Sequence, residues 1–173
     1  RSAGPGDMAA MQLDAVSVMA RDLLPVMLRH GTGTEAAGGD MARRVMDMLR
    51  RWDGTMARDM PEPLIFTAWL GELNRQLYAD ELGPDFGAFR GLRPEFVRAI
   101  LTRYLDWCDD VSTDRKEDCG ERIVRARDIA LQSLSRRFGD DPARWRWGEA
   151  HRAYFRHQLL GRVPLLRQLS DIA

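Results

Sequence analysis

Cysteine and histidine are the residues of this chain with the most obvious potential for chemistry. Cys108 and Cys119 enclose a polar, acidic segment. Their spacing matches no zinc-binding pattern, because such patterns need closely paired cysteines or nearby histidines. The surrounding carboxylates disfavour a thiolate, so neither cysteine is expected to act as a nucleophile. The polarity of the segment also argues against either cysteine filling the core. We expect a local disulfide, with two free thiols as the alternative.

A disulfide between Cys108 and Cys119 would have two consequences. It would stabilise the fold by about 2–3 kcal/mol, mainly by restricting the unfolded chain. It would also imply an oxidising compartment, because disulfides persist outside the cytosol. We therefore expect a periplasmic or secreted protein.

The three histidines do not form a metal site by their spacing. His151 and His157 lie too far apart to share one turn of a helix, and His30 is remote in sequence. We expect no metal and no cofactor in this chain. His151 follows two tryptophans, Trp145 and Trp147. We expect His151 to be a structural histidine, with a pocket residue as the alternative. Trp145 and Trp147 could line a ligand pocket or fill the seam between the helices and a neighbouring domain, so all three are candidates for a structural role or for supporting a site from behind.

Other catalytic signatures are missing from the sequence. It contains neither a Gly-x-Ser-x-Gly elbow nor a Walker phosphate loop, so no catalytic residue is predicted. Lys and Arg number 26, and Asp and Glu number 26. This balance argues against a nucleic-acid partner, which needs a cationic surface. No apolar run is long enough to predict a membrane span.

The elements that must position these residues are all predicted to be helical. β-Branched residues are scattered, and no hairpin dipeptide joins two alternating runs. Apolar residues recur instead at helical spacing. The expected helices cover about residues 8–28, 40–52, 61–83, 94–105 and 120–138.

The helical pattern also predicts individual caps, kinks and buried faces. Asp7 is expected to cap the first helix and Pro25 to kink or divide it. Met8 and Met11 are placed on its inward face, as are Tyr104 and Leu105 on that of the fourth helix. Residues 85–92 are expected to form a loop. The apolar tail 159–172 suggests that more protein should cover it.

Three stretches, taken in order, carry a resemblance to a known family. They are Met11–Ser17 with Ala20–Pro25, then Leu49-Arg-Arg-Trp-Asp-Gly54, then Trp145-Arg-Trp-Gly-Glu-Ala-His151. Together they resemble the penicillin acylase (penicillin amidase) family of N-terminal-nucleophile hydrolases. The segment from Trp107 to Cys119 is similar to the cysteine loop of periplasmic members. The resemblance covers nearly the whole chain.

The resemblance implies a parent enzyme with an αββα fold, cut by self-processing into an α chain and a β chain. The N-terminal Ser of the β chain would be the nucleophile. Its α-amino group, with a pKa near 8, would be the general base. An Asn side chain and backbone N–H groups would stabilise the oxyanion.

None of these catalytic residues carries over to this chain. The family's β chain opens with Ser, Asn and an aromatic residue, whereas Ser2 is followed by Ala3. Asn74 is expected in the middle of a helix and matches no oxyanion motif. The resemblance therefore implies that residues 1–173 are one helical segment of the middle to late β chain, without the catalytic sheet.

The implied partners are the α chain and the rest of the β chain, and the implied substrate of the parent is a small-molecule amide. A β-lactam side-chain amide and an N-acyl homoserine lactone both fit that class. Any calcium would be bound elsewhere in the parent. The alternative hypothesis is a stand-alone helical interaction module without catalysis.

Overall fold

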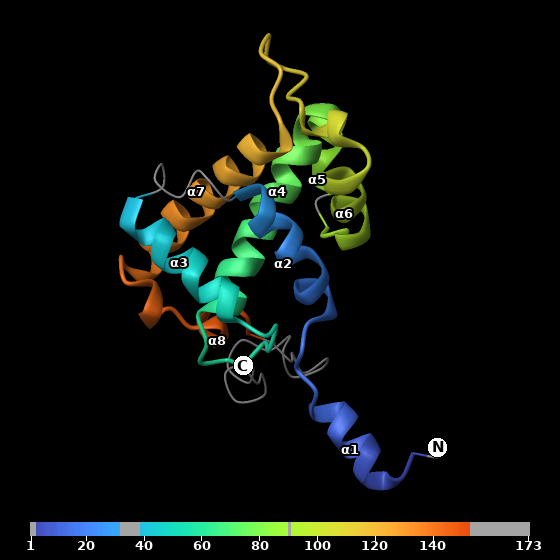
Figure 1. Cartoon of the computed structure of the whole chain (residues 1–173), viewed down its shortest axis with the longest axis vertical. Helices are drawn as coiled ribbons and strands as arrows, with labels where there is room; N and C mark the ends of the chain where they lie inside the picture. Colours follow the sequence, from blue (N-terminus) through green and yellow to red (C-terminus); the bar gives the residue numbers. More distant parts are fainter. Residues whose placement is uncertain (1–2, 32–38, 90, 153–173) are drawn as a thin grey trace, which may run out of the picture.

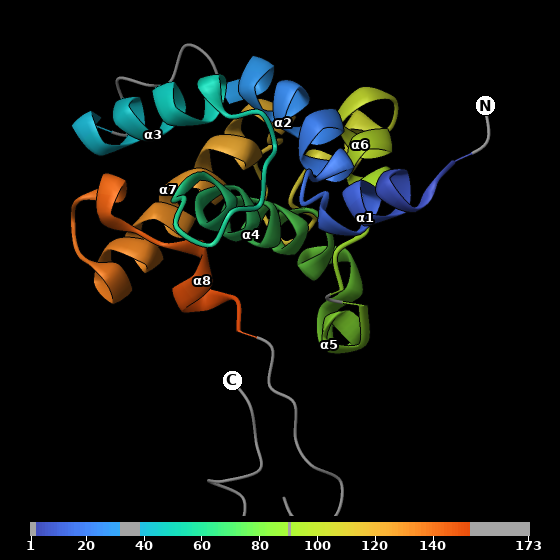
Figure 2. The same cartoon turned by 90° about the horizontal axis from the view of Figure 1, so that it is seen from below.

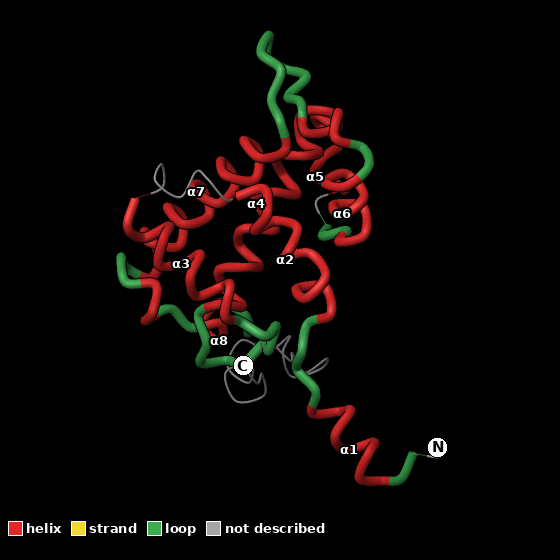
Figure 3. The backbone as a smooth tube through the Cα atoms, viewed as in Figure 1, coloured by secondary structure: helices red, strands yellow, loops and turns green. Residues whose placement is uncertain are grey.

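The computed structural model describes residues 3–31, 39–89 and 91–152. Within these ranges the regular elements are helices, and the β pairing consists of an isolated antiparallel bridge between Val16 and Thr55 (Figures 1 and 3). The expectation of an all-α chain is confirmed. The α-helices are α1 (Pro5–Leu13), α2 (Val18–Gly31), α3 (Gly39–Arg51), α4 (Glu62–Leu82), α5 (Phe86–Phe89), α6 (Pro94–Thr102), α7 (Cys119–Phe138) and α8 (Trp147–Ala150). Three 3-10 helices are η1 (Gly83–Asp85), η2 (Leu105–Cys108) and η3 (Pro142–Arg144).

Helix α4 is the centre of the fold, and its main partner is α7. Helices α2 and α3 lie across this pair (Figures 1 and 2). Helix α6 lies near the C-terminal part of α4, where Phe96 stacks on Tyr78. Trp69 of α4 is fully buried, and its indole N–H donates to the carbonyl oxygen of Ile123 in α7 at 2.9 Å. This hydrogen bond satisfies the polar edge of a large apolar side chain inside the core.

Helix α7 begins and ends where the sequence predicts. Asp118 is the N-cap: its carboxylate accepts from the N–H of Glu121 at 2.8 Å, and the Glu121 carboxylate accepts from the N–H of Asp118 at 3.1 Å. This capping box satisfies two N–H groups that the helix itself leaves open. Gly139 ends the helix with φ +87°, a conformation that favours glycine.

The prediction of one helix over residues 8–28 is wrong, because the chain breaks between α1 and α2. The N–H of Ser17 donates to the carbonyl of Gly54 at 2.9 Å, and the N–H of Met56 donates to that of Ala15 at 2.9 Å. The Ser17 hydroxyl then accepts from the N–H of Ala20 at 3.1 Å and caps α2. Long-range backbone pairing thus replaces helical bonds at the break. Helix α2 instead continues through Pro25.

The separation of α1 from α2 also overturns the predicted burial of two methionines. Helix α1 has no buried residue, and Met8 and Met11 are exposed. It projects away from the other helices (Figure 1). Its apolar side chains therefore have no core to pack against within the described ranges.

The fourth predicted helix ends earlier than expected. Helix α6 stops at Thr102, and the chain turns through η2, so that Tyr104 and Leu105 are exposed rather than inward. This turn directs Cys108 into the interior. Residues 85–92 were expected to form a loop, but they include the last residue of η1 and the short helix α5. The apolar tail 159–172 and His157 lie outside the described residues.

Candidate functional site

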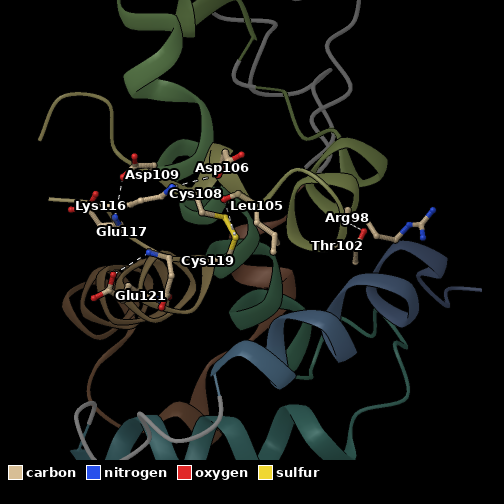
Figure 4. Close-up of a disulfide and its surroundings, with 11 residues drawn as sticks. Arg98, Thr102, Leu105, Asp106, Cys108, Asp109, Lys116, Glu117, Cys119 and Glu121 are labelled. Atoms are coloured by element: carbon tan, nitrogen blue, oxygen red, sulfur yellow. Dashed lines mark hydrogen bonds and ion pairs between the residues drawn. A yellow bond between two sulfur atoms is a disulfide. The ribbon is translucent and has the colours of Figure 1, made fainter. Parts of the chain in front are cut away.

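The cysteine loop is closed by a disulfide. Cys108 at the end of η2 and Cys119 at the start of α7 are bonded, with their Cα atoms 4.9 Å apart (Figure 4). Both residues are buried in the core, which corrects the expectation that they would not fill it. The reason is that η2 and α7 both pack on the central helix α4, while residues 111–116 between the two cysteines are exposed.

Carboxylates organise the polar loop that the disulfide closes. The nearly buried carboxylate of Glu117 accepts hydrogen bonds from the N–H of Asp110 at 3.1 Å and from the hydroxyl of Thr113. The N–H of Glu117 donates to the Asp109 carboxylate at 3.0 Å. These acids therefore shape the loop through hydrogen bonds to its backbone and to Thr113.

A buried arginine joins this loop to the centre of the fold. Arg122 of α7 donates to the carboxylates of Asp110 at 2.9 Å and Asp80 at 3.2 Å, and to the Gln76 side-chain oxygen at 3.2 Å. The Ser112 hydroxyl, and then Arg122, hold the pKa of Asp110 below its usual value. One cation thus links α7, α4 and the disulfide loop.

Arg122 was not predicted from the sequence as a buried residue. Its position three residues after Cys119 and four before Ala126 places it on the face of α7 that is buried. A charged residue on such a face could have indicated a buried ion pair, because buried charges are almost always paired. Its acidic partners on other elements could not be identified from local spacing.

The described residues of this arrangement supply no nucleophile, because Arg122 is ion-paired with the carboxylates of Asp80 and Asp110 and neither sulfur is a free thiol. Among the residues with described positions, no group of three His, Cys, Asp or Glu side chains could hold a metal ion. Asn74 is buried within α4, and Ser2 lies outside the described ranges. No described helix is both long and apolar enough to cross a bilayer.

The segment that contains Trp145 and Trp147 follows α7 and η3 and contacts the loop before α4. Trp145 is fully buried, and its indole N–H donates to the Gly139 carbonyl at 2.8 Å. The N–H of Trp147 donates to the Met60 carbonyl at 3.0 Å. This segment therefore closes one end of the α4–α7 pair.

His151 lies beside Trp147. Its ring stacks on that of Trp147, with centroids 4.4 Å apart and planes 9° from parallel, and the residue is exposed. Both residues line a small hollow with Leu64 and Phe138. It stays a prediction that these residues, with Trp145, support a substrate pocket.

The Trp-Asp-Gly stretch forms the junction at which α2 begins. The Trp52 indole N–H donates to the Thr55 carbonyl at 2.9 Å, and the Asp53 carboxylate accepts from the N–H of Thr55 at 2.8 Å. Gly54 has φ +89°, and a Cβ there would lie 3.3 Å from the Ser17 carbonyl oxygen and 3.2 Å from Arg21 Cγ. The motif therefore needs glycine at this position for backbone pairing.

The chain is similar to a known protein family and to several curated proteins. The family model described as Penicillin amidase matches residues 2–171. A protein named acyl-homoserine lactone acylase QuiP from Pseudomonas aeruginosa is 28% identical over 119 residues, which are 64% of this chain and 14% of that protein. Its namesake from Pseudomonas syringae pv. tomato is 25% identical over 179 residues, 93% of this chain and 21% of that protein.

A third relative with the same name, from Pseudomonas putida, is 27% identical over 160 residues, which are 82% of this chain and 20% of that protein. The matched region thus spans between 14% and 21% of the length of these curated relatives. The match to the family model extends over nearly all of the sequence. The chain therefore belongs to the penicillin amidase family.

Proposed function

We propose that this chain is the helical part of an amide-hydrolysing acylase of the penicillin amidase type. The family match over residues 2–171 carries the proposal. The names of the curated relatives support acylase activity for the parent, with an N-acyl homoserine lactone as the first substrate to test and a penicillin side-chain amide as the second. This chain by itself would be inactive.

The proposed reaction takes place on residues outside this chain. The hydroxyl of an N-terminal Ser would attack the amide carbonyl while its own α-amino group accepts the hydroxyl proton. The proton would then pass to the leaving amine as the C–N bond breaks and an ester forms. Water would hydrolyse this ester, release the carboxylic acid and regenerate the serine.

The role of this chain would be to brace the catalytic sheets and to help shape the substrate entrance. A catalytic constellation needs rigid elements behind it, and α4, α7, the disulfide and the Arg122 network form such a block. We propose the α chain and the rest of the β chain as its partners. The disulfide supports a periplasmic or secreted location.

The test uses the full-length protein that contains this chain. We expect processing into two chains, a Ser at the N-terminus of the larger one, and release of the amine from an N-acyl homoserine lactone or a penicillin. Replacing that Ser with Ala should abolish both processing and hydrolysis. A protein that is not processed and hydrolyses neither amide would contradict the proposal and favour the helical interaction module.

A further inference from the structure

The Cys108–Cys119 disulfide is closed off from solvent in the folded chain. Cys108 is 0% and Cys119 is 5% exposed, and η2 and α7, which carry them, both pack on α4. Thiol–disulfide exchange requires a thiolate to reach one of the two sulfur atoms. Some part of the structure must therefore move before this disulfide can be reduced.

The disulfide loop, residues 109–118, is braced close to the two sulfur atoms. The Glu117 carboxylate accepts from the N–H of Asp110 at 3.1 Å, and the N–H of Glu117 donates to the Asp109 carboxylate at 3.0 Å. These two hydrogen bonds join the first residues of the loop to its last ones, next to Cys108 and Cys119 (Figure 4). Because they lie within the loop, they preserve its shape without fastening it to the helices.

Two contacts fasten the disulfide loop to the central helices. The Asp110 carboxylate accepts from Arg122 of α7 at 2.9 Å, and the N–H of Val111 donates to the Asp80 carboxylate of α4 at 3.2 Å. Arg122 in turn pairs with Asp80, and the side chains of Arg122, Asp80 and Asp110 are 3%, 7% and 16% exposed. We call these four residues the latch of the loop.

Two further ion pairs between the loop and its neighbours are exposed. Arg115 pairs with Glu121 of α7 at 2.7 Å, with side chains that are 65% and 42% exposed. Lys116 lies 3.6 Å from Asp106 of η2, with side chains that are 75% and 97% exposed. Exposed pairs of this kind contribute little to stability. The latch is therefore the stronger fastening of the loop.

We propose that the disulfide loop is a lid over the disulfide, and that the latch controls how fast thiols reduce it. When Asp110 separates from Arg122, the loop moves away while the α4–α7 pair stays folded, and a sulfur atom becomes accessible. Local opening of this kind costs less free energy than unfolding of the whole chain. The lid concerns the redox state of this chain and does not depend on the acylase assignment.

The exchange partner admitted by the open lid is a dithiol. One of its thiolates attacks a sulfur atom of the disulfide, the S–S bond breaks, and the released cysteine thiolate takes a proton from water. The second thiol loses its proton and attacks the mixed disulfide, which releases the other cysteine to be protonated in turn. The dithiol is oxidised to a disulfide, and the protein gains two hydrogens.

The rate of reduction in the full-length protein tests the latch. Dithiothreitol is added under native conditions, samples are alkylated at intervals, and the peptides with Cys108 and Cys119 are quantified by mass spectrometry. Asp110→Asn should accelerate reduction by about tenfold, because the charged hydrogen bond to Arg122 is lost. Asp106→Asn is the matched control: it removes the same charge from a side chain that is 97% exposed, and it should leave the rate unchanged.

A variant destabilised elsewhere separates opening of the lid from unfolding of the whole chain. A Cβ at Gly54 would crowd Ser17 and Arg21 rather than the disulfide loop, so Gly54→Ala should leave the reduction rate unchanged. Equal acceleration by Gly54→Ala and Asp110→Asn would overturn the lid, because reduction would then follow global unfolding. Equal acceleration by Asp106→Asn, or an unchanged rate in Asp110→Asn, would overturn the role of the latch.

Hydrogen exchange of the wild-type protein provides a test that needs no variant. The N–H of Val111 should exchange faster than the N–H groups in the middle of α7, because the lid opens while the helices persist. Exchange of Val111 that is as slow as that of the α7 interior would show that the loop opens only with the whole fold, and would overturn the proposal.

Discussion

Arg122 of α7 and Asp80 of α4 form a buried ion pair with 3.2 Å between Nη2 and Oδ2, and their side chains are only 3% and 7% exposed. Arg122 also contacts Asp110 of the disulfide loop at 2.9 Å. The main helix pair and the loop are therefore joined through one guanidinium group. Removing a partner from such a network leaves an uncompensated buried charge, which is strongly destabilising.

Arg122→Ala should lower the free energy of unfolding by about 3–5 kcal/mol, because Asp80 and Asp110 would lose their common cation. Urea denaturation followed by tryptophan fluorescence measures the change. Arg75→Ala is the control: Arg75 pairs with Glu72 within α4 but is half exposed, so the loss there should be below about 1 kcal/mol. Equal losses for the two variants would argue against a special role for Arg122.

Reduction of the Cys108–Cys119 disulfide should lower the free energy of unfolding by about 2–3 kcal/mol, because the unfolded chain is no longer restricted. Intact-mass measurement with and without reductant should show the two added hydrogens. The variant Cys108→Ala/Cys119→Ala provides the control, since its stability should not respond to reductant. A wild-type unfolding curve that is the same in both conditions would refute this prediction.

Ser112→Ala should make the protein more sensitive to acid. The pKa of Asp110 is lowered in the folded state, first by the Ser112 hydroxyl and then by Arg122. Its contribution to stability is therefore present above the unfolded pKa, about 3.9, and is lost as the pH falls through the folded pKa. Removing the hydroxyl raises the folded pKa, so this loss begins at a higher pH.

Acid titration followed by tryptophan fluorescence measures the effect of Ser112→Ala. In an Asp110→Asn background the same substitution should not move the acid transition, because the titrating group is gone. A shift of equal size in both backgrounds would show that the Ser112 hydroxyl acts through some group other than Asp110.

Gly54→Ala should destabilise the protein by about 1–3 kcal/mol, since the residue has φ +89° and a Cβ would crowd Ser17 and Arg21. Gly71→Ala is the matched control, because Gly71 lies within α4 and a Cβ there meets nothing within 4 Å. That change should instead stabilise by about 0.5–1 kcal/mol through helix propensity. Thermal unfolding of both variants should show opposite shifts of the midpoint, and shifts of the same sign would contradict the explanation.

The features that could be predicted from the sequence depend on residues close together in the chain. Helix α7 is an example: its capping residues Asp118 and Glu121, its apolar repeat and the terminating Gly139 all act over a few positions. The expected disulfide is also local. The family resemblance joined such short motifs in order, and the match over residues 2–171 confirms it.

The tertiary structure decided what depends on partners distant in sequence. The break before α2 exists because Ser17 pairs with Gly54, and Arg122 is buried because Asp80, 42 positions away, lies opposite it. Tyr104 is exposed because α6 ends early and the chain turns to bring Cys108 into the core. Local periodicity records only a residue's neighbours along its own helix, whereas burial and charge pairing depend on which other elements pack against that helix.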